Sequence, residues 1–538
     1  MNGTAHRRRT RLGLGALLLA PAPLLAAGDE ALHNVWAITG ARIVTMAGPP
    51  VEGGTVVIRD GLVEAVGRSV AVPADAEVVD GAGLTVAPGF IDACSEALLK
   101  LPDRPAPPTG GAPATDEQRG LTPDRHAWEY AILGKATLAK HHAVGITAAL
   151  AVPGAGLLPG QASLLALSSE DRLQAILLRD AALVVTFSPG AGYPNSLMGV
   201  MAFLRQELLD AAHYGAHAAR WAADPRGVPR PTFDRRRELL ARAAAGSLPV
   251  VFICRNQHDI RRALSLRDEF HLTAVVADAG GEAFRVLPEL RRARVPVLVS
   301  VTYRAPATAT WSQRGEDERR RAEQELYPTN ARQLAEAGVP FAFASLGSDT
   351  PEAFIAGVRR AVEAGLGVER ALRALTADAA GIVGAGAFLG TIEAGKIANL
   401  VVSDGPPLRP DAKLKLVFAD GRRFAMKERK LKDAEAPTVN VTGRWELSVE
   451  RGMGAGTKSV VTFTQEESSL SGTYSTPRGD ADFTDGEVAG NQIAFEVSLT
   501  LGGRSFDLFV TGTVEGDTIR GTVSTARSSN PFTARRIP

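Results

Sequence analysis

Two side chains that can bind a divalent metal ion stand close together in an apolar stretch of the chain. Cys94 and Glu96 share one face of an expected strand, because alternate residues of a strand point the same way. Cysteine and glutamate are both metal ligands, and Asp349 is a further candidate after a later strand. A tetrahedral zinc site needs additional ligands, which are not evident in the sequence. The alternative is a packed strand end without a metal.

The histidines do not supply the missing ligands. His141 and His142 are adjacent, so they cannot share a helix face, and we expect them to be surface or cap residues. His213 and His217 have the i, i+4 spacing of a helical metal pair, but nothing else in the sequence converges on them. We therefore interpret both pairs as structural.

The N-terminus has the pattern of a secretory signal peptide. A basic run at residues 7–11 precedes an apolar stretch at residues 12–25 and small residues at 26–28. The apolar stretch is short for a membrane span and contains prolines, which makes a retained anchor the less favoured alternative. We expect residues 1–27 to be cleaved, without lipid attachment because no cysteine lies near the site. The mature protein would be periplasmic or secreted, with no membrane span.

Composition indicates a folded protein with more than one domain. The chain has 538 residues, of which 45% are apolar and 22% charged. Its formal net charge is +1, so no overall field favours nucleic acid or an anionic membrane as a partner.

The pattern of elements changes along the chain. Residues 35–79 predict short strands separated by turns, and after residue 89 apolar strands alternate with helices. The clearest of these strands and helices are expected at residues 146–152, 183–187, 249–253, 273–277 and 295–301, and at residues 196–214 and 232–245. Such alternation suits an α/β fold with a (β/α)8 barrel, and an open doubly wound sheet is the alternative.

The β-rich pattern returns at residues 388–424 and again beyond a charged linker. The last hundred residues or so predict an antiparallel barrel or sandwich, in which the element Gly-Thr recurs at residues 472–473, 512–513 and 521–522. We expect its core to contain five aromatic residues, namely Trp445, Phe463, Phe495, Phe506 and Phe509.

Two distant groups of motifs resemble the amidohydrolase superfamily, in particular its imidazolonepropionase-like branch. The first group is TGARIV at residues 39–44, GTVVIRDG at 54–61 and APGFIDA at 87–93. The second is ALT at residues 374–376 and LGTIEAGKIANLVV at 389–402. The resemblance covers residues 35–424 and implies that the two β-rich flanks pair as one small sandwich beside the barrel.

The sequence patterns and, for residues 35–424, the resemblance together give the expected domains. They are a signal peptide at residues 1–27, the first sandwich part at 34–86, the barrel at 87–385, the second sandwich part at 386–426, a linker at 427–440 and an antiparallel β domain at 441–538.

In that family, the first barrel strand ends in His-x-His, and later strands supply a lysine, two more histidines and an aspartate. These residues hold one or two divalent ions that activate water. Here the His-x-His positions hold Cys94 and Glu96, the fifth-strand position holds Ile253, and residues 275–281 contain no histidine. Asp349 lies beyond the place that the family pattern gives to the aspartate. The resemblance therefore implies a barrel without most of its metal ligands.

A disulfide between the two cysteines of the chain, Cys94 and Cys254, is disfavoured in such a barrel. Strands one and five stand on opposite sides, too far apart for a disulfide. We expect two free and mostly buried thiols. Cys254 could join a metal site only if the strand register were shifted by one residue.

These observations favour an exported amidohydrolase-related protein whose metal-dependent hydrolysis of C–N bonds is lost or strongly altered, with no cofactor. It could act with a homologous amidohydrolase, with a second copy of itself, or on a small-molecule or peptide-like ligand. The first alternative is an active hydrolase of cyclic amide or peptide-like C–N bonds with a recast site of Cys94, Glu96 and Asp349, which would hold a divalent metal such as zinc. The second alternative is a binding protein that acts through its C-terminal β domain.

Overall fold

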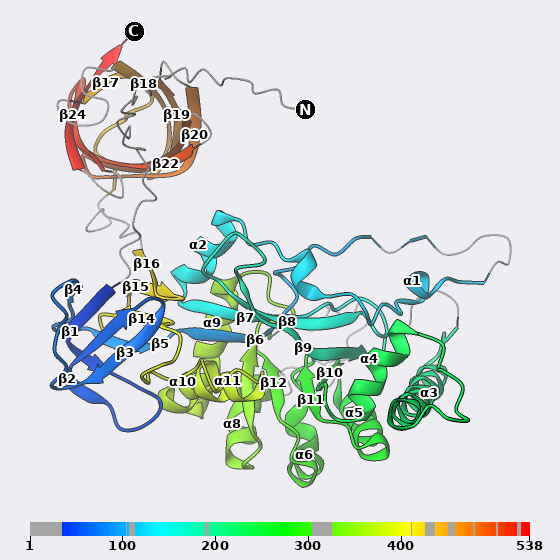
Figure 1. The fold of residues 1–538 in the computed structure, drawn as a ribbon. Helices are drawn as coiled ribbons and strands as arrows, with labels where there is room; N and C mark the ends of the chain where they lie inside the picture. Colours follow the sequence, from blue (N-terminus) through cyan, green and yellow to red (C-terminus); the bar gives the residue numbers. More distant parts are fainter. Residues whose placement is uncertain are drawn as a thin grey trace, which may run out of the picture. The chain divides into compact units, whose positions relative to one another are not determined.

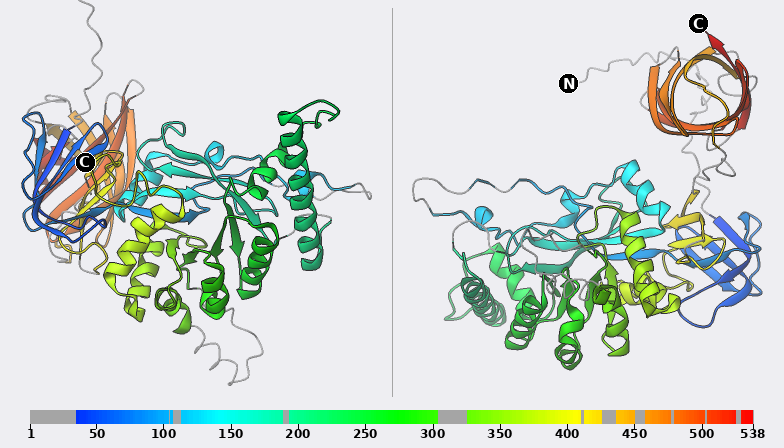
Figure 2. Two further views of the ribbon diagram at one scale, coloured as in Figure 1. Left: turned by 60° about the horizontal axis from the view of Figure 1, so that its bottom comes forward. Right: turned by 180° about the vertical axis from the view of Figure 1, so that it is seen from behind.

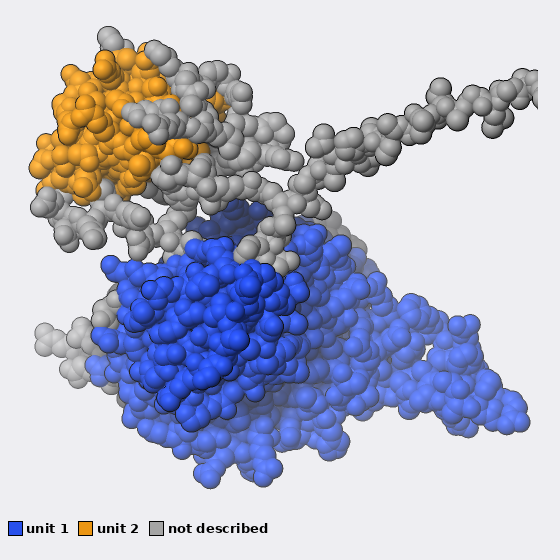
Figure 3. Space-filling view, turned by 60° about the vertical axis from the view of Figure 1, so that its left-hand side comes forward, with its two compact units in different colours: residues 1–426 blue, residues 427–538 orange. Residues whose placement is uncertain are grey.

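The computed structural model divides into two compact units, residues 1–426 and residues 427–538, which are coloured separately in Figure 3. The predicted signal peptide and residues 427–435 of the predicted linker lie outside the described residues. The structure describes residues 35–103, 105–106, 113–188, 193–303, 325–409, 412–425, 436–449, 458–476, 479–501, 504–524 and 529–537.

The two β-rich flanks form one mixed sheet within the described part of the chain (Figure 1). Its strands are β1 (Val35–Ile43), β2 (Val51–Arg59), β3 (Leu62–Gly67), β4 (Glu77–Asp80), β5 (Thr85–Pro88), β14 (Leu400–Ser403), β15 (Leu414–Ala419) and β16 (Arg422–Ala425). The flanks meet where β5 pairs antiparallel with β14, with Leu400 opposite Pro88. Side chains from both flanks, including Ile38, Ile58 and Phe418, share one buried cluster. The prediction that each flank completes the other is confirmed.

Eight strands of the described residues follow one another around the barrel. They are β6 (Phe90–Ser95), β7 (Ile146–Ala151), β8 (Gly160–Ala166), β9 (Ile176–Thr186), β10 (Val250–Cys254), β11 (Ala274–Asp278), β12 (Val297–Ser300) and β13 (Phe341–Ala344). The last strand returns to the first, because the backbone N–H of Ser345 donates to the Asp92 carboxylate over 2.9 Å. The sheet is therefore nearly closed, which confirms the predicted α/β barrel over the open sheet.

One strand departs from the regular alternation of a (β/α)8 barrel. β8 runs antiparallel to both of its neighbours, β7 and β9, whereas the other neighbouring pairs are parallel. No helix of the described residues separates β7 from β8 or β8 from β9. A direct turn between neighbouring strands requires opposite directions, since a parallel return needs a longer crossover.

Most helices lie along the side of the barrel formed by β10 to β13, and α2 packs against β7 (Figures 1 and 2). The longest, α3, begins after Ser196, whose hydroxyl accepts from the N–H of Gly199 over 3.2 Å. The buried residues of α3 lie in its first half, from Val200 to Ala211, where it packs beside α4. The helices are α1 (Asp116–Arg119), η1 (Ala127–Tyr130), α2 (Lys135–Ala143), α3 (Leu197–Ala223), α4 (Arg235–Ala244), α5 (Gln257–Phe270), η2 (Ala283–Val286), α6 (Leu287–Ala293), η3 (Tyr327–Thr329), α8 (Asn330–Glu336), α9 (Pro351–Ala361), η4 (Val362–Leu366), α10 (Val368–Leu375) and α11 (Ala377–Ile382).

The C-terminal unit is a closed antiparallel barrel in the described residues (Figure 1). Its strands are β17 (Gly443–Val449), β18 (Lys458–Glu466), β19 (Ser469–Thr476), β20 (Gly479–Ala489), β21 (Gln492–Leu501), β22 (Arg504–Glu515), β23 (Thr518–Ser524) and β24 (Ser529–Ile537). Trp445, Phe463 and Phe495 lie in its core as predicted. The side chains of Phe506 and Phe509 lie outside the described residues.

The recurring glycines of this unit stand where strands approach closely. A Cβ atom on Gly521 would lie 1.9 Å from the carbonyl oxygen of Thr511, and one on Gly472 would lie 1.9 Å from that of Thr462. Gly521 also faces Gly512 across β22 and β23. Glycines at such positions let the strands of a small barrel bend.

Candidate functional site

A pocket of about 440 Å3 lies where several barrel strands end. The strands β6, β7, β9 and β10 each lead into it at their carboxyl ends, which is the end where α/β barrels carry their sites. Charged, polar and apolar residues line it, namely Glu96, Leu99, Leu101, Val152, Gly154, Ala155, Gly156, Ser188 and Arg255.

Glu96 occupies the second position of the expected His-x-His pair and faces this pocket. Its carboxylate lies directly against the loop after β7: a Cβ atom on Gly154 would lie 1.8 Å from Glu96 Oε1. The side chain reaches solvent through the pocket, yet the protein atoms around it raise the pKa of the carboxyl, an effect that the positive charge of Arg255 opposes. Glu96 is thus a partly enclosed carboxylate with a cation nearby.

Arg255 follows directly after β10 and supplies that cation. Its backbone N–H donates to the buried Asp259 carboxylate over 3.1 Å. Its carbonyl group lies so close to Gly280 that a Cβ atom there would be 2.0 Å from the oxygen. The backbone of Arg255 is therefore fixed from two sides, while its side chain is exposed to the pocket.

The interior of the barrel is apolar along the strands that should carry metal ligands. Ile253, at the predicted fifth-strand ligand position, lies in the interior cluster, and Ala277 occupies the interior position of β11. The same cluster contains Cys94, whose burial raises the pKa of the thiol well above its ordinary value. A protonated thiol is a poor metal ligand, since the thiolate is the form that binds.

Asp349 does not join Cys94 and Glu96. It is exposed in the loop between β13 and α9, whereas Cys94 is wholly buried. Within the described residues, no three side chains among His, Cys, Asp and Glu come together in a way that could hold a metal ion. The donor set found here therefore does not fit the divalent metal that the family implies.

The thiol of Cys254 packs in the outer cluster, among the residues that face the helices. Its Sγ donates to the Phe252 carbonyl over 3.5 Å. Cys254 and Cys94 are both buried and both free, and they lie in different hydrophobic clusters. Cys254 does not face the barrel interior, so it is no part of a site there.

Two buried aspartates beside the pocket hold backbone in place. Asp92 accepts from the backbone N–H groups of Cys94, over 3.3 Å, and Ser345, over 2.9 Å. Asp278, at the end of β11, accepts from the N–H groups of Glu282 and Ala283 and from the side-chain amide of Asn330. Burial raises the pKa of Asp278 to about 6. Both carboxylates already have backbone partners.

The expectation for His141 and His142 was wrong, because α2 is covered on the side that carries them. Both rings are buried. His141 Nδ1 lies 2.7 Å from the carbonyl oxygen of Thr137, and His142 Nε2 lies 2.6 Å from that of Leu167. Burial lowers the pKa of His142. Each ring has a backbone partner, which gives both residues a structural role.

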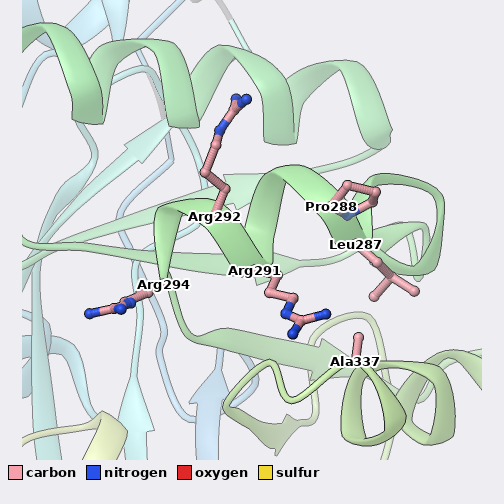
Figure 4. A pocket seen from close by; sticks show the side chains of 6 residues that line it. All are labelled: Leu287, Pro288, Arg291, Arg292, Arg294 and Ala337. Atoms are coloured by element: carbon pink, nitrogen blue, oxygen red, sulfur yellow. The ribbon is translucent and has the colours of Figure 1, made fainter.

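A second hollow, of about 570 Å3, lies away from the strand ends between α6 and the end of α8. Figure 4 shows its lining residues, including Arg291, Arg292 and Arg294. The three side chains point in different directions rather than toward one another (Figure 4). They do not converge on a common anion, so this hollow is a poor candidate site.

Sequence reasoning missed Arg255, Gly154 and Ser188 as pocket residues. The position of Arg255, a charged residue directly after a buried strand, was a usable signal. Gly154 and Ser188 carry no comparable signal, since only the folded chain brings them to Glu96.

Comparisons with known proteins agree with this fold. Residues 324–428 match the model of the amidohydrolase family. The amidohydrolase from Thermotoga maritima MSB8 is similar in structure with a TM-score of 0.60 and 24% identity, over 72% of this chain and 99% of that chain. A Xaa-Pro dipeptidase with methionine bound in its active site has a TM-score of 0.44 and 14% identity, over 73% of this chain and 100% of that chain. No curated protein matches the chain.

The first unit is thus an α/β barrel with a pocket at the carboxyl ends of several strands. Residues 324–428 match the amidohydrolase family, and the fold of the first unit is similar to that of a solved amidohydrolase. A search of the described residues finds no helix with the length and apolar character needed to cross a membrane.

Proposed function

We propose that this chain is an exported amidohydrolase-related protein whose metal-dependent hydrolysis of C–N bonds is lost or strongly altered. The match of residues 324–428 to the amidohydrolase family and the similar fold support a hydrolase-type ancestry and a site at the barrel mouth.

One observation carries the proposal: the positions that would hold imidazole ligands hold side chains that cannot replace them. Cys94 is sealed in the apolar interior, Ile253 and Ala277 have no donor atom, and Glu96 alone offers a carboxylate. A single carboxylate holds zinc weakly, because tight sites combine several imidazole, thiolate and carboxylate ligands. Without a bound ion, water in the pocket keeps its ordinary high pKa and is a poor nucleophile.

Export rests on the signal-peptide pattern at residues 1–27. A periplasmic or secreted barrel without hydrolysis would act by binding, either to a small ligand at its mouth or to a homologous chain. The C-terminal barrel as the binding module remains a prediction from sequence.

The experiment is a hydrolysis assay on the purified mature chain after incubation with zinc, manganese or cobalt. Substrates would be cyclic amides and dipeptides, and bound metal would be measured in the same samples. We expect turnover no greater than that of a matched blank. The control is Asp268→Ala, which removes an exposed carboxylate of α5 that does not line the pocket. Metal-dependent turnover that disappears in both Cys94→Ala and Glu96→Ala and persists in this control would overturn the proposal in favour of the recast site.

A further inference from the structure

The pocket at the barrel mouth contains two opposite charges that are not used by the fold. Among the described residues, neither the Glu96 carboxylate nor the Arg255 guanidinium has an ion-pair or side-chain hydrogen-bond partner, although each feels the charge of the other. By contrast, Asp92, Asp259 and Asp278 near the same strand ends all hold backbone N–H groups. The charges of Glu96 and Arg255 therefore remain available to a ligand.

The rest of the pocket limits what such a ligand can be. Leu99, Leu101 and Val152 give it an apolar side. Its volume of about 440 Å3 falls within the range of small-molecule sites, roughly 300–1,000 Å3. A ligand that fits must be small, partly apolar and charged at two points.

We propose that this pocket binds a small zwitterion, namely a free amino acid or short peptide with an apolar side chain. Its ammonium group lies at Glu96, its carboxylate at Arg255, and its side chain against Leu99, Leu101 and Val152. The inference rests on the proposed function in one respect, since an organic ligand can occupy the mouth in this way only if no metal does.

Charge complementarity favours a zwitterion over a ligand with a single charge. A purely anionic ligand would pair with Arg255 but bring negative charge to the partly enclosed Glu96. A purely cationic ligand would leave Arg255 without a partner and facing like charge. Arginine can bind a carboxylate through two parallel hydrogen bonds, which fixes the orientation of the ligand as well as its charge.

Isothermal titration of the full mature chain tests this directly. The probes are L-leucine and L-leucyl-L-leucine, with N-acetyl-L-leucine, which lacks the ammonium, and L-leucinamide, which lacks the carboxylate. We expect at least one of the two zwitterions to bind, and each blocked analogue to bind about tenfold more weakly than L-leucine, the loss typical of one charge-assisted hydrogen bond.

Two substitutions test which side chain binds the ammonium group of the ligand and which binds its carboxylate. Glu96→Gln should weaken L-leucine about tenfold and leave N-acetyl-L-leucine unchanged, and Arg255→Gln should weaken L-leucine and leave L-leucinamide unchanged. Asp349→Asn and Arg291→Gln, which are exposed charges outside the pocket, are the matched controls and should change nothing. Absence of binding by both zwitterions, or equal binding by wild type and both pocket variants, would contradict the inference.

Metal content measured on the same samples separates this inference from the proposed function. Stoichiometric zinc that is lost in Glu96→Ala and that competes with L-leucine would place a metal at the mouth and would contradict both the proposed function and this inference. Failure of both zwitterions to bind a zinc-free protein would contradict the ligand inference alone.

Discussion

The chain contains two eight-stranded barrels in its described residues, and they fill their interiors in different ways. The interior of the α/β barrel is built from small and aliphatic side chains such as Ala93, Val251 and Ala342. The antiparallel barrel is filled by aromatic rings, among them Trp445 and Phe463. In the α/β barrel, the charged side chains of Glu96 and Arg255 lie just after the ends of β6 and β10. The α/β barrel therefore has a charged pocket outside its apolar interior, whereas the interior of the antiparallel barrel is filled by its aromatic core.

The largest effect should come from the core of the antiparallel barrel. Trp445 is fully buried, and its indole N–H donates to the Val441 carbonyl over 2.8 Å. Trp445→Ala should lower the free energy of unfolding of this unit by about 4 kcal/mol. Hydrogen exchange of peptides from residues 443–537 would measure the loss without disturbance from the other unit. Trp221→Ala, in α3, is the control; an equally small loss in both variants would show that the ring is not the centre of the core.

The next effect concerns the closure of the α/β barrel between β6 and β13. Asp92→Ala would leave the backbone N–H groups of Cys94 and Ser345 buried without their acceptor. We expect a loss of about 3 kcal/mol in denaturant unfolding of this unit. Asp349→Ala removes an exposed carboxylate and should cost less than about 0.5 kcal/mol. Equal losses for the two variants would argue against closure through Asp92.

Asp278 should give the α/β unit a pH dependence that the antiparallel barrel lacks. Its folded pKa of about 6 exceeds the unfolded value of 3.8, so the folded state binds the proton more tightly. Its contribution to stability therefore rises as the pH falls through about 6 and levels off below 3.8, by about 3 kcal/mol in all. Unfolding free energies against pH should show this rise in wild type and in Asp268→Ala, but not in Asp278→Ala. Parallel curves for wild type and Asp278→Ala would contradict the assignment.

The substitution Gly154→Ala should have the smallest effect on stability but should weaken ligand binding in the pocket. A Cβ atom at Gly154 would collide with the Glu96 carboxylate, so Gly154→Ala should displace that group. We expect L-leucine affinity to fall about tenfold while stability changes by less than about 1 kcal/mol. Gly134→Ala, where a Cβ atom meets nothing within 4 Å, is the control for titration calorimetry. Unchanged L-leucine affinity in Gly154→Ala would show that the position of the Glu96 carboxylate does not matter for binding.

Local sequence signals predicted most of the fold. The strands expected at residues 146–152 and 249–253 correspond to β7 and β10, and the helix expected at residues 196–214 corresponds to α3. The reversed strand β8 was not predicted, because residues 160–166 have the apolar composition of a strand but nothing that fixes its direction. Strand direction depends on pairing between distant segments.

The candidate site was harder to predict than the fold. Spacing placed Glu96 at the mouth. The burial of His142, by contrast, involves contacts of α2 with β16 and with Leu167 after β8; the centroid of the Phe424 ring lies 4.0 Å from that of His142. The approach of Arg255 to Glu96 joins strands β10 and β6, which are far apart in sequence. Contacts of this kind form only when the barrel closes, so the sequence of neither strand predicts them by itself.

Equilibrium dialysis of the mature chain against zinc most directly tests whether the pocket of the α/β barrel binds a metal ion. We expect no tight stoichiometric binding, and the same weak binding in Cys94→Ala and Glu96→Ala as in wild type. One tightly held zinc per chain, lost in both variants, would contradict this account.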